Sequence, residues 1–307
     1  MRLRDIKKDW MINKAVYFMA LPMLIYFIIF NWLPIGGMML AFEEYSSRGG
    51  TLGSQYIGFQ NFVDFFATSY LARIFRNTIV ISLMSMAINF PAPIILALLL
   101  NEMENQLYKK VIQTVSYMPY FISTVVICGI IKDFVANDGP ITYALYNMGV
   151  ISTRQDLLTS GLAFRFFRPI FVISNAWQST GYGSIIFLAM LSSVDQELYE
   201  AAKIDGAGRW KQTLHVTIPG ILPIIMLMLI MQVSSLLNVA MEKILLLYAA
   251  TNYEVSDVIM TFVYRSGLQQ GRQGYATAVQ IFNSLISMAL LLISNSVSRK
   301  VSDFSLF

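Results

Sequence analysis

The chain has a single cysteine, a single histidine and few charged residues for its length. Of its 307 residues, 13% are charged, about half the share found in an ordinary soluble domain. One cysteine cannot form an internal disulfide, and it cannot assemble a zinc site or a catalytic triad with one histidine. No Gly-Lys dipeptide occurs, so the phosphate-binding P-loop is absent. These absences argue against a metalloenzyme, a triad hydrolase and a domain that hydrolyses ATP itself.

Hydrophobic residues make up 56% of the chain, and six windows contain no Asp, Glu, Lys or Arg. Each window has at least 21 residues, and a helix of about 20 apolar residues spans the hydrocarbon core of a bilayer. The windows are 15–42, 77–101, 111–131, 169–194, 212–241 and 273–298. We therefore predict an all-α integral membrane protein with six transmembrane helices.

The distribution of Lys and Arg predicts the orientation in the membrane. With a cytoplasmic N-terminus, the inside segments 1–14, 102–110, 195–211 and 299–307 hold 12 of the 22 basic residues. These segments are less than half as long as the outside segments, as the positive-inside rule requires. We expect a cytoplasmic lead (1–14), one six-helix domain (15–298) and a cytoplasmic tail (299–307). Because the net charge of +4 follows this topology and forms no single patch, no nucleic-acid partner is expected.

Three further stretches carry local predictions. Pro91 and Pro93 break the second helix, and the freed backbone groups need protein partners, so this helix should face other helices. Residues 56–62 predict a short amphipathic element on the outer surface. Residues 141–151 are uncharged but too short to cross, so we expect them in the interface plane or in an external cap.

The polar stretch 195–211 interrupts two apolar windows and alternates acidic and basic residues. Ser193 and Gln196 have the spacing of a capping box, which predicts a helix start. Gly206 is a natural helix stop, and residues 209–215 predict a second short helix. On these residues alone, a solvated loop and a docking element for another chain are equally good interpretations.

A spaced motif within this hairpin points to a family. Glu200, Ala201 and Ala202 are followed by three residues, Gly206, nine residues, and a VTIP segment that ends at Pro219. This pattern resembles the EAA motif of binding-protein-dependent ABC importer permeases, which ends in I-x-L-P. The two departures in the last segment are conservative.

The resemblance covers essentially the whole chain. Six spans, the motif between the fourth and fifth, and the 56–62 stretch are similar to maltose-type carbohydrate permeases. Residues 253–259 and 262–268 are similar to the polysaccharide-type subfamily, which includes the alginate importer permease. One departure is at 241–243, where the family pattern has an aromatic residue before the acidic one.

The resemblance implies a type I ABC importer permease in the bacterial cytoplasmic membrane, a multi-pass transport subunit and not an enzyme. It implies a second homologous permease (a heterodimer), two ATP-binding-cassette subunits and an extracytoplasmic solute-binding lipoprotein. ATP and magnesium would be bound by the ATPase, and this chain would hold no cofactor. The hairpin 195–215 would couple the chain to the ATPase through Glu200, Ala201, Ala202, Asp205, Gly206 and Pro219.

Polar and aromatic residues in the fourth and fifth helices are candidates for the substrate pathway. Amides and hydroxyls can hydrogen-bond sugar hydroxyls, and aromatic rings can stack on sugar rings. The same residues can instead pair with neighbouring helices, and for any one residue packing is the stronger interpretation. The candidates are Asn175, Trp177, Gln178, Tyr182, Gln232, Ser235 and Asn238.

Other functional classes fit the sequence less well. An ion-gradient-driven secondary transporter of a small polar solute is the main alternative, but it should carry carboxylates or histidine within its spans. All six windows lack Asp and Glu. An intramembrane enzyme would need a nucleophile with a base or a metal set, and a membrane scaffold would not need the motif spacing.

Overall fold

The structure is a computed structural model that describes all residues except 1–9, 11, 47–49, 51–52 and 303–307. Most of the predicted lead (1–14) and tail (299–307) therefore lies outside the described residues. The chain divides into two compact units. The first comprises Met1–Thr68 and Val263–Ile281, and the second comprises Ser69–Phe262 and Phe282–Phe307.

The first unit begins with a long apolar helical segment. Helix α2 (Lys14–Phe27) continues through a π-helical turn (Ile28–Trp32) into a 3-10 segment (Leu33–Phe42). Together they form a 29-residue span, and no residue of its most apolar window is buried. The hydrophobic effect inside this chain therefore does not hold the segment, and its apolar surface requires a nonaqueous environment.

A small hairpin and an amphipathic helix follow this segment. Strand β1 (Glu43–Glu44) pairs antiparallel with β2 (Gln55–Tyr56), and α3 (Gln60–Ala67) buries Asn61 and Phe65. The short amphipathic element predicted at 56–62 is thus present, divided between β2 and the first turn of α3. Its position on an outer membrane surface remains a prediction.

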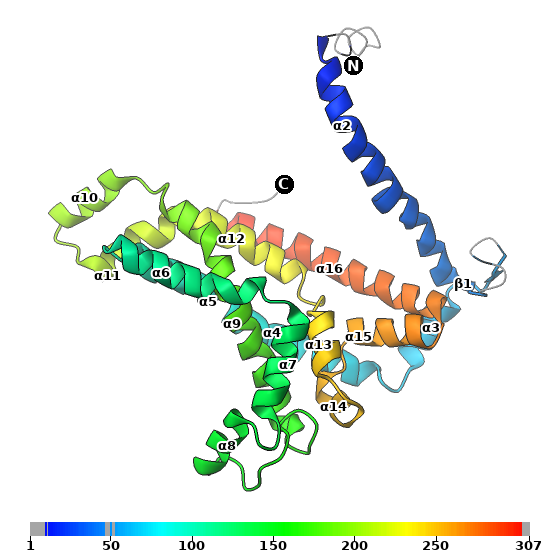
Figure 1. The fold of residues 1–307 in the computed structure, drawn as a ribbon. Coiled ribbons are helices and arrows are strands. Elements are labelled where there is room, and N and C mark those ends of the chain that lie inside the picture. The colour runs from blue at the N-terminus through cyan, green and yellow to red at the C-terminus, as the bar shows by residue number, and fades with distance from the viewer. Residues whose placement is uncertain (1–9, 11, 47–49, 51–52, 303–307) are drawn as a thin grey trace. The chain divides into compact units, whose positions relative to one another are not determined.

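The second unit contains most of the helices (Figure 1). In chain order they are α4 (Leu71–Asn89), α5 (Pro91–Asn101), α6 (Gln106–Tyr117), α7 (Thr124–Val135), α8 (Pro140–Asn147), α9 (Ala163–Leu191), α10 (Gln196–Ile204), α11 (Arg209–Gln212), α12 (Ile218–Ser234), α13 (Met241–Leu247) and α14 (Tyr253–Ser256). Helices α15 (Ile259–Tyr264) and α16 (Gln273–Ser302) extend from one unit into the other.

Helix α9 is the centre of the second unit, and α4, α5, α6 and α12 all pack against it. Glycine permits the closest of these contacts. A Cβ atom on Gly181 would lie 1.9 Å from the carbonyl oxygen of Ser116 in α6, and one on Gly183 would lie 3.2 Å from the ring of Pro93 in α5. The proline-broken second helix therefore does face other helices, as the prolines predicted.

Two apolar clusters hold the unit together along α9. One surrounds Phe167 and Phe171, with Ile244 of α13 and Val258 before α15. The other joins Phe187 and Leu191 to Ala97, Val194 and Ile221. The hairpin formed by α10 and α11 lies at the end of the unit away from α8 and α14 (Figure 1).

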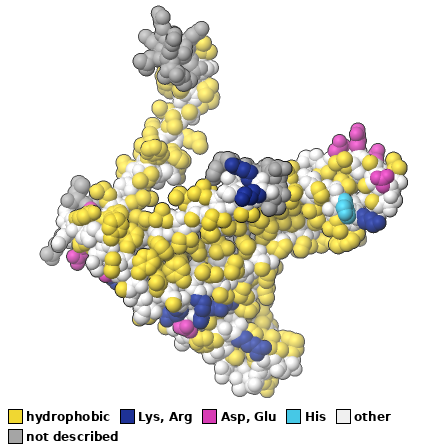
Figure 2. Space-filling model, turned by 180° about the vertical axis from the view of Figure 1, so that it is seen from behind, with side chains coloured by type: hydrophobic (Ala, Val, Ile, Leu, Met, Phe, Trp, Pro, Cys, Tyr) yellow, Lys and Arg dark blue, Asp and Glu magenta, His cyan; other side chains and the backbone are white. Residues whose placement is uncertain are grey.

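The described helices include four that are long and apolar enough to cross a membrane, or five if one bent pair counts as a span. The four are Lys14–Phe42, Leu71–Asn101, Arg209–Ser234 and Gln273–Lys300. They coincide with four of the six predicted windows. Figure 2 shows hydrophobic side chains over most of the visible face, with charged side chains confined to a few separate places.

The other two windows differ from the prediction in instructive ways. Window 111–131 is not one straight helix, because the chain bends by 96° between Gln106–Phe121 and Thr124–Asn147. Ser123 starts the new helix by accepting a hydrogen bond from the Val126 amide, so the bend is capped. Most of window 169–194 lies in α9, which is 29 residues long. Amides, hydroxyls and glycines lower the hydropathy of this helix, so it is not among the four spans.

Candidate functional site

The first helix of the polar hairpin forms as predicted, as α10, but with a different cap. The second is not a separate short helix, because α11 continues through a π-helical turn (Thr213–Thr217) into α12, so that Arg209–Ser234 is one helical span. The Asp195 carboxylate accepts a hydrogen bond from the Glu197 amide at 3.0 Å and caps α10. The predicted capping box is not formed, because the Ser193 hydroxyl donates to the Met190 carbonyl at the end of α9. Gly206 ends α10 with φ +76°, a conformation that favours glycine.

Three side-chain contacts fix the hairpin to its surroundings. Gln212 donates to the Ala207 carbonyl at 2.6 Å, and Tyr199 pairs with the Thr217 hydroxyl at 3.0 Å. Arg209 reaches the loop between α5 and α6, where its guanidinium lies 2.7 Å from a Glu104 carboxylate oxygen. The hairpin is therefore held both by the start of α12 and by a neighbouring loop.

Most of the predicted coupling residues are exposed. On the hairpin these are Glu200, Ala201, Asp205 and Gly206, whereas Ala202 is half-buried. Pro219, in the first turn of α12, is also exposed. Two large apolar side chains accompany them, Ile204 at 87% exposed and Trp210 at 76%. Both side chains are available for contact with another chain. Neither residue is among the predicted coupling residues, although large apolar residues within a polar stretch are a signal that the sequence contains.

A polar cavity of about 220 Å³ lies between α4, α9 and the end of α12. Four predicted pathway residues meet there: Asn175, Gln232, Ser235 and Asn238. Helix α4 contributes Ser82, Ser85 and Asn89, which were not among the predicted pathway residues. The lining contains amides, hydroxyls and apolar groups, and no charged side chain.

Some polar atoms of this lining have no hydrogen-bond partner among the residues that the structure describes. The Ser85 hydroxyl and the Asn89 carbonyl oxygen are buried and unpartnered. By contrast, the Asn238 carbonyl oxygen accepts a hydrogen bond from Asn283 of α16 at 2.9 Å. A buried unpaired polar group is costly, so a guest with hydroxyl groups or water would be stabilised here.

The other three predicted pathway residues do not line this cavity. Trp177 is 54% exposed on another face of α9. The Tyr182 ring stacks on Tyr120, with centroids 4.0 Å apart. Gln178 accepts a hydrogen bond from the Lys243 ammonium at 3.3 Å. Because successive helical residues turn by about 100°, neighbours of Asn175 in the sequence point elsewhere.

Lys243 of α13 is a buried cation. Lys243 is 1% exposed, and its ammonium donates a hydrogen bond to the neutral Gln178 amide. Within the described chain, no carboxylate lies within 4 Å of it. Burial lowers the pKa of Lys243 to about 8, which leaves it mostly charged at neutral pH.

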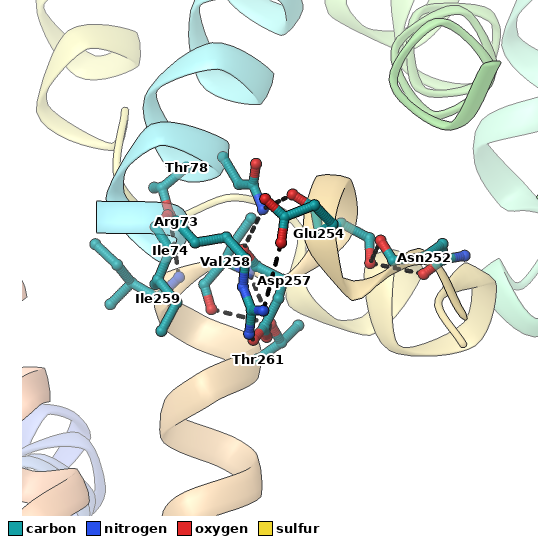
Figure 3. Close-up of polar contacts among 11 residues, drawn as sticks. Arg73, Ile74, Thr78, Asn252, Glu254, Asp257, Val258, Ile259 and Thr261 are labelled. Carbon is teal, nitrogen blue, oxygen red and sulfur yellow. Dashed lines mark hydrogen bonds and ion pairs between the residues drawn. The ribbon is translucent and has the colours of Figure 1, made fainter. Parts of the chain in front are cut away.

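An ion-pair network anchors the stretch 253–259 to α4 (Figure 3). The Arg73 guanidinium lies 3.5 Å from both the buried Asp257 carboxylate and the Glu254 carboxylate. Asn77 donates to the backbone carbonyls of Glu254 and Asp257, and accepts from Arg168 of α9 at 2.8 Å. These contacts hold the stretch 253–259, which contains α14, against α4 and α9.

The chain belongs to a family of membrane transport components. Residues 89–303 match the family described as the inner membrane component of binding-protein-dependent transport systems. Since the match covers more than half of the chain, the protein is a multi-pass membrane permease of an ABC importer, a transport subunit and not an enzyme.

Its relatives include two proteins of Bacillus subtilis (strain 168). Protein LplB is 38% identical over 295 residues, covering 96% of this chain and 92% of the relative. The polygalacturonan/rhamnogalacturonan transport system permease protein YteP is 36% identical over 295 residues, covering 96% and 91%.

A solved structure has the same fold over the full chain. It is the bacterial alginate ABC transporter in complex with an alginate pentasaccharide-bound periplasmic protein, with TM-score 0.88, 37% identity and full coverage of both chains. A second structure, of an ABC transporter that imports the acidic polysaccharide alginate, gives TM-score 0.86 at 38% identity over 97% of this chain and 98% of that one.

Proposed function

We propose that this permease carries oligosaccharide fragments of an acidic polysaccharide, delivered by an extracytoplasmic binding protein. YteP is named for polygalacturonan and rhamnogalacturonan, and the two solved transporters for alginate, all of them acidic polysaccharides. The polar cavity supports the saccharide part of this proposal, because its unpartnered Ser85 and Asn89 atoms match sugar hydroxyls. Buried Lys243 contacts Gln178, which does not line the cavity, so its charge would favour an acidic guest only through the positive potential that it adds to this part of the unit.

The proposed topology has six spans with both termini in the cytoplasm. Four of the six are the apolar spans described above. The bent pair α6–α7 is the third span in chain order, and α9 is the fourth. The bend and the polar residues of α9 are tolerable in a membrane where they face protein or a water-filled path. The α10–α11 hairpin then lies on the cytoplasmic side, and α8 and α14 lie outside.

The hairpin is proposed to dock on an ATPase subunit. A heterodimer with a second permease and two ATPase chains would place two such hairpins on two motors, which bind the ATP and magnesium. When ATP closes the motors, the hairpins approach each other and the permease pair opens outward. A remote ligand shifts a conformational equilibrium only through its different affinity for the two states. Hydrolysis removes the ATP that favours the outward-open state, so the permease pair returns to the inward-open state.

The substrate proposal depends on the cavity lining, and it is tested by substitutions that fill the cavity with larger apolar side chains. Asn175→Leu and Ser235→Leu should abolish uptake of uronate oligosaccharides while the ATPase still co-purifies. Trp177→Leu, on another face of α9, should transport normally. Uptake of neutral oligosaccharides of the same length should be weak in the wild type. Equal uptake of both classes would refute the acidic preference, and normal uptake in the filled variants would refute the cavity assignment.

Docking on the ATPase is tested at Glu200. Glu200→Ala should lose transport and substrate-stimulated ATP hydrolysis while the protein stays in the membrane. Glu197→Ala changes an exposed carboxylate on the same helix and serves as the matched control. Gly206→Pro should also uncouple, because proline cannot adopt the positive φ of this turn. Full transport in both Glu200→Ala and Gly206→Pro would reject the docking role.

A further inference from the structure

A second cavity, of about 340 Å³, lies entirely within the first unit. The residues around it come from β1, α3 and the start of α16. Three carboxylates line it, those of Glu43, Glu44 and Asp64, together with the guanidinium of Arg272. This lining is unlike that of the polar cavity in the second unit, which has no charged side chain.

The carboxylate of Glu43 is held in place without a partner for one of its oxygens. Glu43 is 8% exposed, and its Oε2 atom is buried with no hydrogen bond. Its backbone is fixed from two sides: Asn61 donates to its carbonyl at 3.1 Å, and a Cβ on Gly274 would lie 2.4 Å from the same oxygen. Because the backbone is fixed, β1 cannot easily move to expose the Glu43 side chain to solvent. Leaving a buried carboxylate oxygen without a hydrogen bond is unfavourable, so a hydrogen-bond donor that enters the cavity would be stabilised by Glu43.

Arg272 does not supply that donor. Its guanidinium lies over the Tyr275 ring, 4.2 Å from the centroid. Among the described residues it forms no ion pair within 4 Å with any of the three carboxylates. Asp64 is satisfied only in part, by a hydrogen bond from Gln60 at 2.8 Å. The cavity thus carries more negative than positive charge and favours a cationic guest.

We propose that this cavity receives a lysine or arginine side chain of the solute-binding protein when that protein docks on the permease. The inference rests on the proposed function and on its six-span topology, in which the segment after the first span (43–76) and the segment before the sixth (242–272) lie outside the membrane. The transported oligosaccharide is a poor guest, because its carboxylates would be repelled by Glu43, Glu44 and Asp64. A charged side chain entering a preformed acidic cavity also fixes the register of two docked proteins.

The test uses the complete importer in lipid nanodiscs and its purified binding protein. The affinity of the two is measured for the wild type, Glu44→Gln, Asp64→Asn and Glu43→Gln. The dissociation constant should rise by about tenfold or more in Glu43→Gln and by less in the two more exposed sites. The salt dependence of binding should weaken in all three. Asp138→Asn, an exposed carboxylate between α7 and α8, is the matched control and should bind as the wild type does.

A second measurement does not depend on the folding of any variant. A carbodiimide joins carboxylates to amines in direct contact, and mass spectrometry should find Glu43, Glu44 or Asp64 linked to a lysine of the binding protein. For an arginine guest, the Glu→Gln affinities carry the result. Unchanged affinity and salt dependence in all three variants would overturn the inference. So would loss of binding on chelation of divalent cations, since the guest would then be a metal ion. If the wild-type importer itself does not bind the protein, it is the proposed function that fails.

Discussion

Arg209 and Glu104 join two segments that are far apart in the sequence. The Arg209 guanidinium on the hairpin lies 2.7 Å from the Glu104 carboxylate in the α5–α6 loop, and 4.0 Å from Glu102. Both partners are exposed, so the pair contributes little to folding stability. Its consequence is positional, because it ties the orientation of the hairpin to the ends of two helices that pack on α9.

Reversing this pair should impair coupling and leave the fold intact. Arg209→Glu places a third negative charge beside Glu102 and Glu104, so the hairpin should swing away from the loop. We expect several-fold less solute transported per ATP hydrolysed, with little change in melting temperature. Glu104→Arg in the same chain should restore the ratio in part. Lys211→Glu is the control. An unchanged ratio of solute transported to ATP hydrolysed in Arg209→Glu would contradict the role of this ion pair in positioning the hairpin.

The ion-pair network at residues 253–259 predicts unequal effects of two neighbouring carboxylates. Asp257 is fully buried beside Arg73, whereas Glu254 is half exposed. Removing one partner of a buried pair costs about 3–5 kcal/mol, and an exposed pair is worth about 0–1 kcal/mol. Asp257→Ala should therefore lower the melting temperature in detergent far more than Glu254→Ala. Equal shifts would contradict the network.

Buried Lys243 predicts a specific pH dependence. Its folded-state pKa of about 8 lies below the ordinary value of 10.5. Below pH 8 the ammonium is charged in both states, and the folded state bears the desolvation penalty. Between about pH 8 and 10.5 the unfolded chain binds more protons, so the stability contributed by this group rises with pH. Lys243→Met should abolish that rise in thermal unfolding, and Lys132→Met, an exposed control, should not. A wild-type curve identical to that of Lys243→Met would disprove the assignment.

The hairpin turn predicts different tolerances of two close glycines. Gly206 has φ +76°, whereas Gly208 has φ −69°, and neither has a neighbour that a Cβ would meet. Alanine at Gly206 should cost about 1–2 kcal/mol in local backbone strain, whereas alanine at Gly208 should be nearly neutral. Proteolysis of the hairpin should therefore accelerate in Gly206→Ala only. Equal rates in both variants would show that the turn is not conformationally restricted.

The local sequence was enough for the elements whose signal lies within a few residues. Gly206 ends its helix where predicted, and the break beside Pro91 lies where the prolines require it, because both follow from backbone sterics. The capping prediction failed at Ser193, since two nearby side chains can cap the same helix and Asp195 does so. The bend at Ser123 was not predicted, because the third window is apolar on both sides of it.

The sequence by itself determined the class of this protein. Long uncharged windows exclude a soluble domain, and the spaced motif at Glu200 identifies an importer permease. Only the tertiary structure decided which side chains meet. It placed Asn175 with Ser85 and Asn89 of α4 at one cavity and turned Trp177 away from it. The physical reason is that hydropathy and spacing are summed along the chain, whereas a site depends on the rotation of each helix against its neighbours, which close packing at residues such as Gly181 sets.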